Sequence, residues 1–202
     1  MESKLKEDTT NLIDKALSYC KEAGLETVFT YELSDDLLDI ISERSKALPS
    51  MYFVSRDTYK DRLKNGCYLI KKGDEVVGHI FAHKHTVYKF GVYERSSLWV
   101  HPDYRKHNLG LLLMHLLTQH YNTEFLISIA QEPAVHQNNQ SLGMLHIPLS
   151  ALSPVIIETL EEIGKLRDEV KYKYYVNPYF ESKIKQINKI LNRINKTNKG
   201  DE

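Results

Sequence analysis

The sequence predicts a single domain of the α/β (α+β) class, in which helices and strands are interleaved and a further helix is added at each end. Three observations support this fold class. The chain has 202 residues, 42% of them hydrophobic and 27% charged, which is ordinary for one globular domain. It contains no internal repeat and no linker rich in glycine, serine or proline. Segments with the 3.6-residue hydrophobic period of helices alternate with shorter, strand-like runs.

The charges of the chain balance, with 27 basic and 27 acidic residues, so no overall field attracts nucleic acid or a membrane surface. The first 15 residues are too charged for a secretory signal, and no apolar run approaches the roughly 20 residues of a membrane helix. Cys20 and Cys67 lack the spacing of metal ligands and are expected to be free thiols. We therefore expect a cytoplasmic protein without a nucleic-acid or membrane partner.

The first third of the chain predicts three helices and one strand. Apolar residues at helical spacing indicate a helix over 8–23, and a strand-like run follows at 26–33. A second helix is expected over 36–48, where Leu48-Pro49 ends it, and a short third helix over 55–65.

The middle of the chain is rich in strands. Residues 67–72 and 75–88 predict a hairpin, because two strand-like runs are joined by a Gly-Asp turn. A strand over 96–102, an apolar helix over 110–121 and a continuous apolar strand over 124–131 follow in that order. This order is typical of a βαβ unit, whose second strand is buried in a parallel pair.

The last third predicts a helix over 154–163, a strand over 168–176 and an amphipathic C-terminal helix. We expect residues 1–178, including an added N-terminal helix at 1–24, to form the domain, and residues 179–202 to form a basic tail.

The basic tail carries lysines and arginine on one side and isoleucines on the other. The simplest expectation is a helix docked by its isoleucines with its lysines in water. Such a helix can also bind an acidic partner, nucleic acid or a membrane surface. Pairing of two chains into a homodimer through the same isoleucines is a further alternative.

The most informative segment joins a strand to a helix through a turn and a basic loop. A helix N-terminus offers free backbone N–H groups and attracts phosphate. Asn108 tolerates left-handed backbone angles, and Gly110 lets a ligand approach the backbone closely. The loop before the helix is basic: it contains Arg105, Lys106 and His107. A pyrophosphate group is the ligand that suits this segment.

This segment resembles the phosphate-binding motif of the GNAT superfamily of acyl-CoA-dependent N-acyltransferases. Residues 100–102 match the Val-x-Pro that precedes the motif in that family. Arg105 stands at the first loop position, Asn108 where the first glycine usually lies, and Gly110 at the second glycine. Residues 75–78 also resemble the connection between the second and third strands of the family.

The resemblance implies a GNAT-like fold, with a mixed, mostly antiparallel central sheet and helices on both faces. It also implies transfer of an acetyl or other short acyl group from acyl-CoA to an amine of a small molecule or peptide. The amine would attack the thioester directly in a ternary complex, with acetyl-CoA (or another acyl-CoA) as co-substrate and no metal. The alternative is a non-catalytic CoA-binding or partner-binding protein that retains the fold.

The resemblance further implies where CoA binds. The strand at 96–100 should splay from the strand at 124–131, so that acyl-pantetheine enters between them and a backbone N–H near Val100 polarises the thioester carbonyl. Asn139 is expected to touch CoA, although the neighbouring Asn138 makes this position ambiguous. The expected CoA-binding residues are Leu98, Trp99, Val100, Arg105, Lys106, His107, Asn108, Leu109, Gly110, Leu111 and Asn139.

Two residues are candidates for acid–base chemistry by the same resemblance. Glu94 lies where many members place a water-linked base, and the alternative is a solvated carboxylate at a strand end. The family's usual tyrosine near the last helix is missing, and residue 160 is a leucine. Tyr174, or Tyr172 on the same strand, is the candidate acid, although alternating tyrosines more often pack against a sheet.

Three histidines of one predicted strand, His79, His83 and His85, have the same parity and therefore face one side of it. Histidines placed in this way can bind a metal. No carboxylate or cysteine completes the set in the sequence, so a polar, substrate-facing strand is the favoured interpretation.

Overall fold

The computed structural model describes residues 2–46, 53–87, 90–152, 154–162, 164–169 and 171–198. They form two compact units. The first contains Met1–Lys84 and Tyr93–Tyr121, and the second contains His85–Val92 and Asn122–Glu202. The strands and their flanking helices confirm the predicted α/β (α+β) class. None of the described helices combines the length and the apolar character that crossing a bilayer requires.

The first unit holds the N-terminal helices and four neighbouring strands in the order β1-β2-β3-β4. β1 pairs with β2, and β2 with β3, in antiparallel fashion, with a register shift between Ile70 and Lys71. Its elements are α1 (Glu2–Ala23), β1 (Glu26–Thr30), α2 (Asp35–Lys46), α3 (Arg56–Leu63), β2 (Cys67–Lys72), most of β3 (Glu75–Val87) and of β4 (Phe90–Val100), the 3₁₀ turn η1 (Pro102–Tyr104) and α4 (Leu109–His120). The end of β3 and the start of β4 belong to the second unit.

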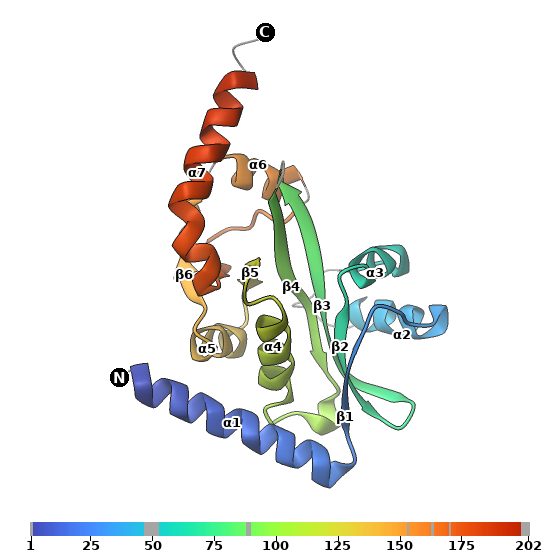
Figure 1. Cartoon of the computed structure of the whole chain (residues 1–202). Helices are drawn as coiled ribbons and strands as arrows, with labels where there is room; N and C mark the ends of the chain where they lie inside the picture. Colours follow the sequence, from blue (N-terminus) through green and yellow to red (C-terminus); the bar gives the residue numbers. More distant parts are fainter. Residues whose placement is uncertain are drawn as a thin grey trace. The chain divides into compact units, whose positions relative to one another are not determined.

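The strands of the first unit are covered on both faces, by α2 and α3 on one side and α4 on the other (Figure 1). The α2–α3 side buries Leu38, Ile41, Tyr59 and Phe81 in one cluster. The α4 side is apolar almost all round its helix, and each fully buried leucine there contributes about 1.5–3 kcal/mol. Gly78 of β3 allows the close approach of α4, because a Cβ there would lie 3.3 Å from a Leu113 methyl.

The second unit contains three strands in the order β5-β7-β6, with both pairings antiparallel. Asn177 joins β7 to the last helix, since its Oδ1 accepts a hydrogen bond from Phe180 N (3.0 Å) and its Nδ2 donates to Glu124 O (2.9 Å). The elements are β5 (Phe125–Ala130), α5 (Pro133–Ser141), β6 (Leu145–Ile147), the 3₁₀ turn η2 (Leu149–Ala151), α6 (Pro154–Glu162), β7 (Lys173–Val176) and α7 (Pro178–Asn198).

Several element boundaries differ from those expected. β7 is shorter than the predicted 168–176, because Lys171 N and Tyr172 N both donate to Asp168 O and form a turn. α5 and β6 were not expected, since both are short and weakly periodic. The break expected at Leu48-Pro49 lies outside the described residues. The parallel pairing and splay expected of 96–102 and 124–131 stay predictions, because the two segments belong to different units.

The tail is helical, as predicted, and belongs to the second compact unit. Ile184 is buried, consistent with docking through the isoleucines, whereas Ile190 is 37% exposed. The side chains of Ile187 and Ile194 lie outside the described residues. A separate domain over 179–202 stays a prediction.

Both cysteines are buried free thiols, as the sequence predicts. Burial raises the pKa of the Cys67 thiol to about 12. Burial also raises the pKa of the Cys20 thiol.

Gly66, which precedes β2, tests how tightly β1 and β2 pack. It has a φ of +80°, and an added Cβ would lie 2.4 Å from Cζ of Phe29. Gly66→Ala should therefore combine backbone strain with a clash. Gly73→Ala is the matched control, because Gly73 also has a positive φ (+59°) but nothing within 4 Å of its added Cβ. We expect Gly66→Ala to lower the free energy of unfolding by about 1–3 kcal/mol more than Gly73→Ala in urea titrations. Equal losses would mean that the Phe29 ring moves aside freely.

Candidate active site

The loop between β4 and α4 is held by short-range hydrogen bonds. Pro102 begins the turn η1, and Arg105 N donates to Pro102 O (3.2 Å). The Arg105 side chain turns back to the strand, where its Nε donates to Val100 O (3.0 Å). Lys106 and Asn108 then take positive φ angles of 69° and 58°, and α4 begins directly afterwards. The left-handed angle of Asn108 is the one that the sequence predicts for it.

These angles leave the start of α4 rich in free donors. Positive φ on either side of His107 turns successive backbone N–H groups toward one another, which is the geometry of an anion-binding nest. No side chain caps α4, and the N–H groups of 106–111 have no hydrogen-bond partner among the described residues. The first turn of α4 contains no acidic residue. The loop is thus suited to a phosphate-bearing ligand.

A second feature is a bulge in β4 at Ser97, which has a φ of 54°. Arg95 points to α4, where its Nη1 donates to Thr118 Oγ1 (2.7 Å). Leu98 also points to α4, since its Cδ2 lies 4.0 Å from the position of a Cβ on Gly110. In a regular strand two residues three apart face opposite sides, so the alternation breaks between them.

With the bulge, Ser97 and Trp99 face the α2–α3 side of the strand. Arg62 of α3 donates through Nη1 to Ser97 Oγ. The guanidinium of Arg44 from α2 lies over the Trp99 ring, 3.9 Å from its centre. His79 of β3 stacks against the same ring.

His79 supports the bulge as a neutral group. Its Nδ1 lies 2.8 Å from Ser97 O, and this carbonyl can only accept, so Nδ1 carries the proton. Burial, with a smaller effect of the Arg44 charge, lowers the pKa of His79 to about 3. Sequence reasoning missed this role, because nothing in the sequence signals a bulge at a serine.

Glu94 lies inside β4 rather than at a strand end, and it is only 5% exposed. The alternative of a solvated carboxylate is therefore wrong. Arg62, 4% exposed, is close enough for the Glu94 charge to act on it, although burial is the larger effect and lowers the pKa of Arg62. A buried carboxylate needs such a counter-charge.

His83 adds an imidazole to this carboxylate. A ring nitrogen of His83 lies within 4.8 Å of a Glu94 carboxylate oxygen, and His83 Nε2 lies 3.9 Å from Asp61 Oδ2. The structure thus places a carboxylate beside a strand histidine, where the sequence offered none. An imidazole and a carboxylate can hold a metal or exchange a proton. We call Glu94, Arg62 and His83 the Glu94 cluster.

Two predicted site residues, Asn139 and Tyr174, belong to the second unit. Asn139 is fully buried in α5, whereas Asn138 is partly exposed. Tyr174 of β7 is also fully buried. Its hydroxyl accepts a hydrogen bond from Arg167 N (2.7 Å) and lies 3.2 Å from Arg167 O, so it ties the loop after α6 to the strand.

Tyr174→Phe tests whether this hydroxyl is structural. The change leaves the partly buried Arg167 N–H without its acceptor, so the free energy of unfolding should fall by about 0.5–1.5 kcal/mol in urea titrations. Tyr179→Phe is the control, since that ring is partly exposed and its hydroxyl has no hydrogen bond among the described residues. An unchanged unfolding free energy for Tyr174→Phe would show that the hydroxyl is not needed for stability, which leaves it free to take part in proton transfer.

Comparison with known proteins places this geometry in a family. The acetyltransferase (GNAT) family profile matches residues 30–145, more than half of the chain. The chain therefore belongs to the GNAT acetyltransferase family. No curated protein sequence matches it.

Solved structures share the fold at low sequence identity. N-acetylglutamate synthase from Neisseria gonorrhoeae, complexed with coenzyme A and N-acetyl-glutamate, is 11% identical with a TM-score of 0.56; the match covers 75% of this chain and 35% of that one. NAA60 from Arabidopsis thaliana in complex with acetyl-CoA is 9% identical with a TM-score of 0.51, and the match covers 75% of this chain and 97% of that one. The matched chain of the NatC complex bound to Gag peptide and CoA is 12% identical with a TM-score of 0.51, and the match covers 75% of this chain and 96% of that one.

Proposed function

We propose that the chain is an N-acyltransferase that moves an acetyl or other short acyl group from acyl-CoA to an amine. The observation that carries the proposal is the basic, donor-rich loop at the start of α4, directly after the bulged end of β4. The loop would hold the CoA pyrophosphate through the N–H groups of 106–111 and the charges of Arg105 and Lys106. The complexes of similar structures with CoA or acetyl-CoA support this donor.

The bulged end of β4 would polarise the thioester carbonyl. Backbone N–H groups near Val100 would donate to the thioester oxygen, on which negative charge develops as the amine attacks. Leu98 and Val100, on the α4 side of the strand, would line the acyl slot. Trp99 faces the opposite side, where Arg44 holds its ring. No covalent enzyme intermediate is needed, because both substrates are bound at once.

Glu94 would remove the proton from the amine. The Arg62 charge compensates the buried carboxylate, and His83 beside it can pass the proton onward. Tyr174 remains the tyrosine proposed to protonate the departing thiolate, and its hydroxyl would first have to leave the backbone groups of Arg167. Water can perform the same step.

The acceptor is proposed to be an amine of a small molecule or a peptide. The similar structures contain N-acetyl-glutamate in one case and a Gag peptide in another, so both classes are known on this fold. The balanced charge of the chain supports a protein without a nucleic-acid or membrane partner, and a cytoplasmic location is part of the proposal. Pairing into a homodimer remains a hypothesis.

The alternative is a CoA-binding or partner-binding protein that has kept the fold without the chemistry. The engaged hydroxyl of Tyr174 is the observation that favours it. A non-catalytic protein would show no turnover, and its CoA-binding form would still bind CoA as the enzyme does.

Negative charge in the loop should strongly weaken CoA binding. In Arg105→Glu with Gly110→Asp, calorimetric titration should show about a 100-fold loss of affinity for acetyl-CoA, CoA and ADP, because the pyrophosphate meets carboxylates. The fold should survive, since a Cβ on Gly110 makes only ordinary contacts at 4.0 Å. The control is Lys60→Glu with Lys64→Ala, which makes the same total charge change at exposed residues of α3 and its C-terminal end, on the other side of the strands from α4. Unchanged affinity in the loop variant would reject the loop as the pyrophosphate site.

Glu94→Gln should separate chemistry from binding. We expect turnover to fall by about 10²–10⁴-fold while the affinity for acyl-CoA stays the same, and the acidic limb of the pH–rate profile should disappear with the base. Glu26→Gln, an exposed carboxylate on β1, is the control. Wild-type turnover in Glu94→Gln would remove Glu94 from the mechanism, and no turnover of any amine by the wild-type protein that binds CoA would favour the non-catalytic alternative.

A further inference from the structure

The N-terminal helix α1 lies outside the part of the chain that matches the family, which begins at residue 30. It nevertheless packs against α4, the helix that begins at the phosphate loop. Ile13, Ala16 and Cys20 form its buried side. The other side is polar, and its role is not explained by packing.

One ring pair connects α1 to the phosphate loop. Tyr19 stacks on His107 with the ring centres 3.7 Å apart and the planes 1° from parallel. His107 is the residue between the two positive-φ positions of the loop, Lys106 and Asn108. The polar side of α1 therefore continues directly from the proposed pyrophosphate site.

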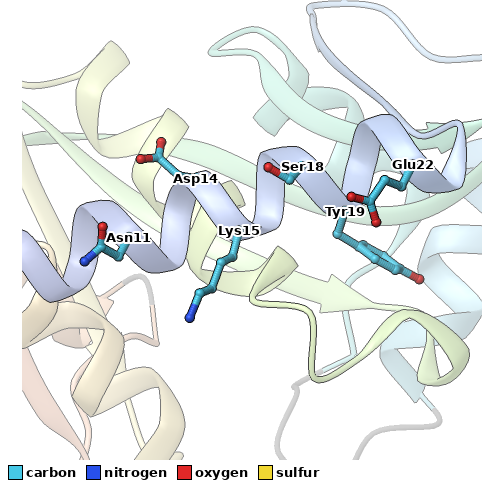
Figure 2. A pocket seen from close by; sticks show the side chains of 6 residues that line it. All are labelled: Asn11, Asp14, Lys15, Ser18, Tyr19 and Glu22. Carbon is cyan, nitrogen blue, oxygen red and sulfur yellow. The ribbon is translucent and has the colours of Figure 1, made fainter.

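A shallow pocket of about 550 Å³ runs along this side of α1 (Figure 2). The side chains of Lys15 and Tyr19 point to the same side of the helix in Figure 2, whereas Asp14 points to the opposite side. Lys15 and Tyr19 are one turn apart, so their side chains are neighbours on the helix. The lining residues are Asn11, Asp14, Lys15, Ser18, Tyr19 and Glu22.

We propose that this side of α1 binds the adenosine 3′-phosphate end of CoA. In CoA the adenosine is bonded directly to the pyrophosphate, so a loop that holds the pyrophosphate brings the adenine and the 3′-phosphate close to His107. The Tyr19–His107 pair gives the adenine an aromatic surface on which to stack. Lys15, one turn before Tyr19, gives the 3′-phosphate its cation. The proposal rests on the proposed function, because it assumes that the loop binds CoA.

Calorimetric titration of the full chain with CoA, 3′-dephospho-CoA and acetyl-pantetheine tests the proposal. Lys15→Glu should weaken CoA by about tenfold and change 3′-dephospho-CoA by less than about twofold, because only CoA carries the phosphate that Lys15 contacts. Tyr19→Ala should weaken CoA and 3′-dephospho-CoA alike, by about tenfold, and leave acetyl-pantetheine unchanged. Tyr19→Phe, which keeps the ring, should bind as the wild type does.

Lys21→Glu is the matched control, since it makes the same charge change on the same helix outside the pocket. Circular dichroism of each variant checks that α1 stays folded. Equal effects of Lys15→Glu on CoA and 3′-dephospho-CoA, or no effect of Lys15→Glu or of Tyr19→Ala, would overturn the α1 subsite while leaving the proposed function intact. A wild-type protein that binds neither CoA nor 3′-dephospho-CoA would overturn the proposed function, and the subsite with it.

Discussion

The positive backbone angle at Ser97 decides which side chains of β4 face which helices. Without this angle, Arg95 and Leu98 would face opposite sides of the strand. If Leu98 kept its position facing α4, the buried Arg95 would lose its hydrogen bond to Thr118. The angle costs about 1–2 kcal/mol for a residue other than glycine, so the surroundings must hold it. His79 does so through the Ser97 carbonyl and Arg62 through the Ser97 hydroxyl. A fixed irregularity in β4 is therefore maintained by side chains from β3 and α3.

The phosphate loop could be predicted from sequence because its chemistry is local. Asn108 and Gly110 are residue types with particular backbone tolerances, and the basic residues before them lie within a few positions. The helix that follows is strongly apolar, so its start is easy to locate. The structure gives Asn108 the left-handed angles expected of it. The hairpin at 67–88 and the strand–helix–strand order after it also depend on local sequence patterns, and the structure contains these elements in that order.

The surroundings of Glu94 could not be predicted, because they depend on residues that the chain brings together from separate elements. Arg62 comes from α3 and His83 from β3, and neither lies within ten residues of Glu94. A glutamate next to an arginine in the sequence, as Glu94 is next to Arg95, suggests an exposed position unless its counter-charge is known. The Tyr19–His107 contact escaped prediction for the same reason, as did α5 and β6, which are too short for a periodic signal.

The burial of both thiols has a practical consequence for assays of the proposed reaction. Burial raises the pKa of both thiols and shields the two sulfurs from solvent, so the folded chain should react slowly with disulfide or alkylating reagents. A chromogenic thiol reagent would then detect the free CoA that the proposed acyl transfer releases, with little background from the protein. The same reagent, added without substrate, would begin to label the chain only as it opens, so one dye can follow both catalysis and loss of the folded state.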